Sequence, residues 1–107
     1  MTSFDDRKDS FEKKFAHDEA LKFKAEARRN KLLGKWAAGL LGLNGQEAED
    51  YVLAVIKADF AEAGDDDVYR KVRADFDAAG IDQSEHQIRR HMDEFMAEAI
   101  RQIKEQG

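Results

Sequence analysis

The sequence contains no cysteine and no proline among its 107 residues. Without cysteine the chain can form neither a disulfide nor a thiolate metal site. Without proline it is compatible with uninterrupted helices that end at glycines. Hydroxyl side chains other than tyrosine are limited to Thr2, Ser3, Ser10 and Ser84, and none has an evident base partner for nucleophilic catalysis. We therefore expect no enzymatic activity.

The sequence also lacks a long apolar run. Its most apolar stretch, residues 30–42, is shorter than the roughly 20 residues that a transmembrane helix needs. The first residues are polar and lack the apolar core of a signal peptide. We expect a cytoplasmic protein that does not insert into a membrane.

Charge is distributed unevenly along the chain. The net charge is −5, but residues 1–42 carry ten basic and seven acidic side chains, whereas residues 43–107 carry eight and sixteen. A split of this kind is typical of a molecule whose two ends prefer different partners. Between residues 22 and 35, six basic residues face only one acid, Glu26. We call these six the basic belt: Lys22, Lys24, Arg28, Arg29, Lys31 and Lys35.

The belt is either a solvated face or a surface for an acidic partner. Nucleic acid is disfavoured as the partner, because the chain is acidic overall and no exposed aromatic residues alternate with the basic ones.

Helical periodicity of apolar residues predicts an all-α fold. We expect a small four-helix bundle over residues 21–107, with a helical or partly disordered N-terminal arm over residues 1–20. The first core helix should bury one face formed by Leu33, Trp36, Ala37 and Leu40. Gly34 and Gly39 should allow close helix packing. Because the loops are short, neighbouring helices should lie antiparallel.

The second helix is expected from about Gln46 to Ala63, with Asn44 and Glu47 spaced as a capping box. Gly64 is placed as its left-handed stop. The residues expected to be buried are Val52, Leu53, Val55, Ile56 and Phe60.

The third and fourth helices should begin at acidic residues. Asp65–Asp67 opens the third helix, whose core positions are Val68, Val72 and Phe76, and Gly80 ends it. Asp82 and Glu85 have cap spacing for the fourth helix. Its expected apolar face contains Ile88, Met92, Phe95, Met96, Ala99 and Ile103.

Metal binding and acid catalysis are poorly supported. His86 and His91 are five residues apart, which places them on different helix faces, so we expect surface histidines and no metal site. Asp59 falls within the apolar arc of the second helix. A partly buried carboxylate bonded to a neighbouring helix is the better interpretation than a catalytic acid. No cofactor is expected.

The N-terminal arm carries Phe4, Phe11 and Phe15 on the continuation of the core face. Burying a phenylalanine contributes roughly 1.5–3 kcal/mol, whereas fixing each backbone residue costs roughly 1–2 kcal/mol. The arm alone should therefore be marginal. It either folds back on the bundle or orders as a helix in a groove of another protein.

Several segments resemble the zeta subunit family, the inhibitor proteins of the ATP synthase catalytic head in alphaproteobacteria. These segments are Phe4-Asp5-Asp6-Arg7, Phe15-Ala16-His17-Asp18, Ala27 to Gly34, Trp36-Ala37-Ala38 and Leu40-Leu41-Gly42, with Ala58-Asp59-Phe60 and Glu62-Ala63-Gly64 further on. Lys35 stands where this family is expected to have an apolar residue.

The resemblance implies an inhibitor of ATP hydrolysis, monomeric when free, that reaches the inner membrane only through the enzyme. Its arm would enter a catalytic α/β interface as a helix, near the gamma subunit, and block rotation in the hydrolysing direction. The implied arm contacts are Phe4, Asp5, Asp6, Arg7, Phe11, Phe15 and His17. The implied contacts at the arm base are Lys22, Lys24, Arg28, Arg29, Asn30 and Lys31.

Two other functions are weighed against this one. The first is a small helical module that binds adenine nucleotide weakly between the basic belt and Trp36. The second, with the least support, is a hydrolase that uses Asp59 and a histidine.

Overall fold

The structure is a computed structural model, and it describes residues 18–60 and 64–106. Those ranges contain four helices and no strand, which confirms the all-α fold. The predicted division into an arm of residues 1–20 and a bundle of residues 21–107 stays a prediction. The helices are α2 (Glu19–Leu40), α3 (Gly45–Ala58), α4 (Asp66–Ala79) and α5 (Glu85–Gln106).

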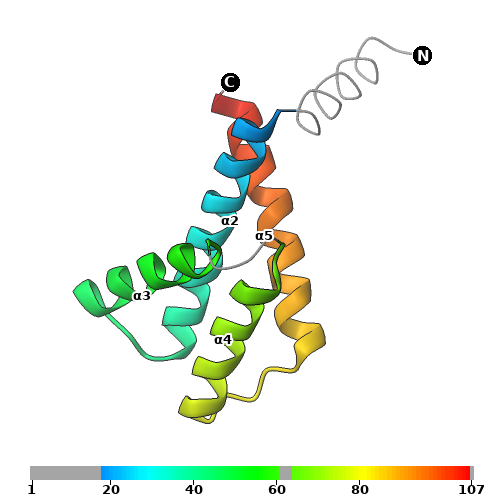
Figure 1. The fold of residues 1–107 in the computed structure, drawn as a ribbon. Coiled ribbons are helices and arrows are strands. Elements are labelled where there is room, and N and C mark those ends of the chain that lie inside the picture. The colour runs from blue at the N-terminus through cyan, green and yellow to red at the C-terminus, as the bar shows by residue number, and fades with distance from the viewer. Residues whose placement is uncertain (1–17, 61–63, 107) are drawn as a thin grey trace.

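The long helices α2 and α5 lie side by side and antiparallel, so the start of α2 is next to the end of α5 (Figure 1). α4 packs on α3 and α5 and runs antiparallel to α5. α3 packs on α2 but runs across it rather than alongside it (Figure 1). The expected antiparallel arrangement therefore holds for α4 with α5 and not for α2 with α3.

The core is shared by all four helices. α4 contributes Val68, Val72 and Phe76, all fully buried, as their spacing of four residues predicted. The remaining buried members of the cluster are Leu33 and Ala37 of α2, Val55 of α3, and Ile88 and Met92 of α5. Ala99 and Ile103 extend the buried face of α5.

α3 is shorter and less buried than expected. It ends at Ala58, and Val55 is its one buried residue. Leu53 and Phe60 are 52% and 64% exposed, so the expectation that both lie in the core is wrong. Because α3 crosses α2, its other apolar faces reach solvent. Leu40, at the end of α2, is likewise exposed rather than buried.

Close packing between α2 and α3 depends on Gly34. A Cβ atom at this position would lie 3.0 Å from the Cα of Val52, so only glycine lets the two backbones approach this closely. The predicted packing role is confirmed for Gly34. It is wrong for Gly39, where an added Cβ would meet nothing within 4 Å.

Helix ends follow the predicted chemistry in part. Gly80 ends α4 in the left-handed conformation with a φ of 71°, as expected. Asn44 precedes α3, but its side chain makes no capping hydrogen bond. α5 is capped by Ser84 instead of Asp82. The Ser84 hydroxyl accepts from the Gln87 N–H (3.1 Å), and the Gln87 side chain accepts from the Ser84 N–H (2.8 Å).

None of the helices in the described ranges is both long enough and apolar enough to span a membrane.

Candidate functional site

The seven residues predicted to contact a partner through the arm lie outside the described residues, which begin at Asp18. Their predicted role therefore stays a prediction. They are Phe4, Asp5, Asp6, Arg7, Phe11, Phe15 and His17.

Four residues of the basic belt form one stripe along α2. Lys24, Arg28, Lys31 and Lys35 are spaced by four, three and four residues, which keeps them on one helix face. The three lysines are exposed and Arg28 is partly buried. Lys22 is also exposed, but it precedes Lys24 by two residues and so faces about 200° away around the helix.

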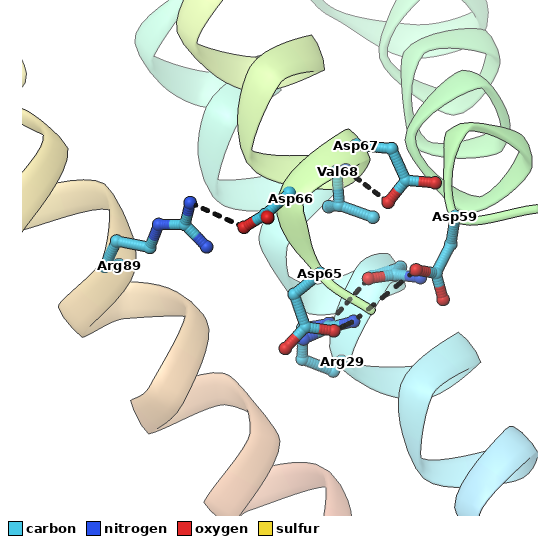
Figure 2. A network of polar contacts seen from close by, with 8 residues as sticks. Arg29, Asp59, Asp65, Asp66, Asp67, Val68 and Arg89 are labelled. Carbon is cyan, nitrogen blue, oxygen red and sulfur yellow. Dashed lines mark hydrogen bonds and ion pairs between the residues drawn. The ribbon is translucent and has the colours of Figure 1, made fainter. Parts of the chain in front are cut away.

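Arg29 and Asn30 are not part of the surface belt. Each is only 1% exposed, so neither side chain is available at the surface. Their predicted contact with a partner at the arm base stays a prediction. The Arg29 guanidinium donates through Nε to the Asn30 side-chain oxygen (2.6 Å) and through Nη2 to Asp65 (3.0 Å). Its Nη2 also lies 3.9 Å from the Asp59 carboxylate (Figure 2).

This buried cation joins three helices. Asp59 follows the last residue of α3 and Asp65 precedes the first residue of α4, so Arg29 of α2 bridges the two helix ends. Removing a partner of a buried charge is costly, because the remaining charge stays away from water. The arginine therefore fixes how α2, α3 and α4 meet.

Asp59 behaves as the partly buried carboxylate that the sequence predicted. Its side chain is 13% exposed and pairs with Arg29 of the neighbouring helix. Burial raises the pKa of Asp59, while the Asn30 amide and the Arg29 guanidinium oppose that rise. Burial also raises the pKa of Glu26, and the negative charge of Asp59 adds to the effect.

The three aspartates at the start of α4 have separate structural roles. Asp65 pairs with Arg29, and Asp66 accepts from Arg89 of α5 at 2.9 Å. Asp67 is buried and accepts from the Val68 N–H at 2.8 Å (Figure 2). No group of three histidine, cysteine, aspartate or glutamate side chains that could hold a metal ion occurs in the part of the chain that the structure describes.

The Trp36 ring packs against other side chains and does not face the basic stripe. Its ring meets Phe76 edge-on at 5.5 Å and stacks on His91 at 4.2 Å between centroids. His91 is therefore partly covered, at 25% exposure, rather than the free surface histidine that was expected. His86 is exposed as predicted. A surface hollow of about 320 Å³ beside the stripe is lined by Arg28, Leu32, Lys31, Lys35, Gln102 and Gln106, and Trp36 is not among them.

A second hollow lies beside a pair of exposed aromatic residues that the sequence did not assign to a site. Phe23 and Phe60 are 55% and 64% exposed, and their ring centroids lie 5.9 Å apart. The only sequence signal was that Phe23 lies off the core face of α2, between Lys22 and Lys24. The expectation that no exposed aromatic residue alternates with the basic ones is therefore wrong at Phe23. The hollow has a volume of about 370 Å³ and is lined by Phe23, Lys24, Ala27, Arg28, Lys31 and Ile56.

The fold and these surfaces define a class: a small helical protein that exposes basic side chains along α2 and aromatic side chains on α2 and just beyond α3. A comparison with protein families identifies the class further. The family described as ATPase inhibitor subunit zeta matches residues 1–102. The chain belongs to the ATPase inhibitor subunit zeta family.

The chain is also similar to a solved structure. It was determined by solution NMR, shares 46% sequence identity, and superposes with a TM-score of 0.70 over 81% of this chain and 99% of its own. No curated protein matched the sequence. The family consists of inhibitor subunits and not of enzymes, in agreement with the expectation that the chain has no catalytic activity.

Proposed function

We propose that this protein inhibits ATP hydrolysis by the F-type ATP synthase, binding its catalytic head from the cytoplasmic side of the inner membrane. One observation carries the proposal: the match to the inhibitor family covers residues 1–102, so it includes the arm as well as α2, α3, α4 and most of α5. A match to the helices alone would support the fold but not the inhibitory segment.

In the proposed mechanism the arm folds as a helix into a catalytic α/β interface, next to the gamma subunit, and blocks rotation in the hydrolysing direction. Phe4, Phe11 and Phe15 are the apolar anchors, and Asp5, Asp6, Arg7 and His17 supply the polar contacts. Because a short free helix is marginally stable in water, the partner supplies the apolar surface that makes ordering favourable. The inhibitor is a monomer when free.

The test is ATP hydrolysis by the cognate catalytic head with increasing amounts of the full-length protein. Phe4→Ala/Phe11→Ala/Phe15→Ala should abolish inhibition, because it removes the anchors and leaves residues 18–106 unchanged. A matched control, Leu40→Ala/Leu53→Ala, removes exposed apolar side chains outside the arm and should inhibit like the wild type. Full inhibition by the triple variant would overturn the arm mechanism.

A second candidate function, weak nucleotide binding, has support from the hollow beside Gln102 and Gln106. Three cations and two side-chain amides line it, which suits a phosphate group. The adenine contact with Trp36 has no support, since that ring packs on Phe76 and His91. Titration with ATP, followed by amide chemical shifts, should give saturable changes at residues 28–35 and 102–106. Their absence would remove this function.

A further inference from the structure

One face at the junction of α2 and α3 exposes aromatic side chains. Phe23 of α2 and Phe60, just beyond α3, pair their rings at the surface. Ile56 and Ala27 line the hollow between them, together with the largely buried Asn30 and Asp59. Large aromatic residues exposed next to one another on a small protein commonly mark an interaction surface. We call this face the α2–α3 surface; it comprises Phe23, Lys24, Ala27, Arg28, Lys31, Ile56 and Phe60.

The cations on this surface differ from those of α4 and α5. Within residues 18–60 and 64–106, Lys24, Arg28 and Lys31 form no ion pair or hydrogen bond through their side chains. On α4 and α5, by contrast, five cations pair with acids of their own or neighbouring helices. Those five are Lys71, Arg73, Arg89, Arg90 and Arg101. The positive charge of the α2–α3 surface is therefore available to interact with an outside partner.

We propose that the α2–α3 surface docks an acidic amphipathic helix of the ATP synthase head, as a second contact beside the arm. The apolar side of that helix packs on Phe23, Ile56 and Phe60, and its acidic edge faces the row of three cations. This is the arrangement by which a helix binds in a groove, with apolar anchors on one face and charge complementarity at the edge. The inference rests on the proposed function, because it takes the enzyme as the partner.

Two observations favour this occupant. The chain's own arm, residues 1–17, has four acidic and four basic residues, so it offers no net charge to complement the cations. The surface also begins one turn into α2, since Phe23 is four residues after Glu19. A partner that holds the arm is therefore already next to this surface.

The first test neutralises the cations in the full-length protein. Lys24→Gln/Arg28→Gln/Lys31→Gln should raise the concentration needed for half-maximal inhibition of hydrolysis about tenfold, with the same inhibition at saturation. The difference from the wild type should shrink at high salt, because exposed charges are then screened. The control, Arg73→Gln/Arg90→Gln/Arg101→Gln, makes the same change in net charge on other helices. It should change the half-maximal concentration by less than about twofold, because exposed ion pairs contribute little.

The second test removes the aromatic pair. Phe23→Ser/Phe60→Ser should also weaken inhibition about tenfold or more, because exposed aromatics at the centre of an interface contribute strongly to binding. The matched control is Leu40→Ser/Leu53→Ser, which removes exposed apolar side chains outside the lining of the hollow. Circular dichroism and thermal unfolding should show that all four variants keep the wild-type fold.

The outcomes separate this inference from the proposed function. If the arm variant Phe4→Ala/Phe11→Ala/Phe15→Ala loses inhibition while both surface variants inhibit like the wild type, the function stands and the second contact is wrong. Tighter inhibition by the surface variants would assign the surface to the chain's own arm. Binding of the wild type, but not of the surface variants, to anionic phospholipid vesicles, with inhibition unchanged, would assign it to a membrane. Either result overturns the inference.

Discussion

Gly34 and Gly39 offer a matched pair for testing how α2 and α3 pack. Both lie inside α2, where alanine is favoured over glycine by about 1 kcal/mol. Gly39→Ala meets no neighbour and should raise the free energy of unfolding by up to about that amount. Gly34→Ala places its Cβ against the backbone of Val52, so α3 has to move. Its free energy of unfolding should be at least about 1 kcal/mol below that of Gly39→Ala.

Urea unfolding, monitored by circular dichroism, measures both variants of this pair. Equal stabilisation by the two alanines would contradict the close contact at Gly34.

Asp59 gives the stability a defined dependence on pH. Burial raises its pKa in the folded protein above the ordinary value of 3.8. Below that ordinary value the carboxyl is protonated in both states, and its contribution to stability is fully present. As the pH rises through the raised pKa, the contribution is lost, because the folded state disfavours the ionised form.

Asp59→Asn cannot ionise, so its stability relative to the wild type should increase between about pH 4 and pH 7. The slope for one proton is at most about 1.4 kcal/mol per pH unit. Glu98, whose pKa Arg101 lowers to about 2, is present in both proteins and largely cancels in the difference. Glu26 does not cancel fully, because Asp59→Asn removes a negative charge that helps to raise its pKa, and this change increases the difference in the same direction. Urea unfolding of both proteins at several pH values measures this difference in stability. If the stability of Asp59→Asn relative to the wild type falls as the pH rises, the pairing of Asp59 with Arg29 outweighs the effect of burial on its pKa.

At the scale of the element, the start of α5 depends on Ser84. Ser84→Ala removes the hydroxyl that accepts from the Gln87 N–H and should lower the free energy of unfolding by about 1 kcal/mol. Asp82→Ala, at the residue that the sequence indicated as the cap, should change it by less than about 0.5 kcal/mol, because Asp82 lies two residues before the cap. Thermal unfolding of the two variants decides between the caps. A larger effect at Asp82 would contradict the Ser84 cap.

The elements that the sequence predicted well are those with a single apolar face. Val68, Val72 and Phe76 repeat every four residues within a largely charged helix, so only one face of α4 could be buried. In α3 the apolar residues surround more of the helix. The sequence of one helix cannot say which of its apolar faces meets a neighbour, and Leu53 and Phe60 were therefore placed in the core wrongly.

The polar part of the site was harder to predict for a related reason. Arg29 pairs with Asp65, which lies 36 residues later in the chain, and no local sequence pattern indicates a contact at that separation. Within a run of basic residues, Arg29 resembles its exposed neighbours. Asp59 was interpreted correctly because a carboxylate inside an apolar arc needs a partner wherever it packs. Phe23 and Phe60 lie together on the surface because α3 crosses α2, and the sequence of either helix does not indicate that crossing.

At the scale of the whole molecule, the proposed inhibitory function and the stability of the fold depend on different parts of the chain. The buried cluster within the described residues draws on all four helices, and α2 packs on α3 and α5 while α4 packs on α3 and α5. The inhibitory residues proposed above precede that cluster in the sequence. A chain organised in this way can change its inhibitory segment without losing its fold.

Thermal unfolding tests this separation and the alternative in which the arm folds back on the bundle. If Phe4, Phe11 and Phe15 packed on the helices, replacing all three by alanine would remove several kcal/mol, since each buried phenylalanine contributes roughly 1.5–3 kcal/mol. For a chain of this length, each kcal/mol shifts the melting temperature by about 4–8 °C. We expect the triple variant to melt within about 3 °C of the wild type, because in the proposed function these three side chains pack on the enzyme and not on the bundle. Circular dichroism at 222 nm measures the transition. A drop of 10 °C or more would place the arm on the bundle of the free protein, and inhibition would then require its release.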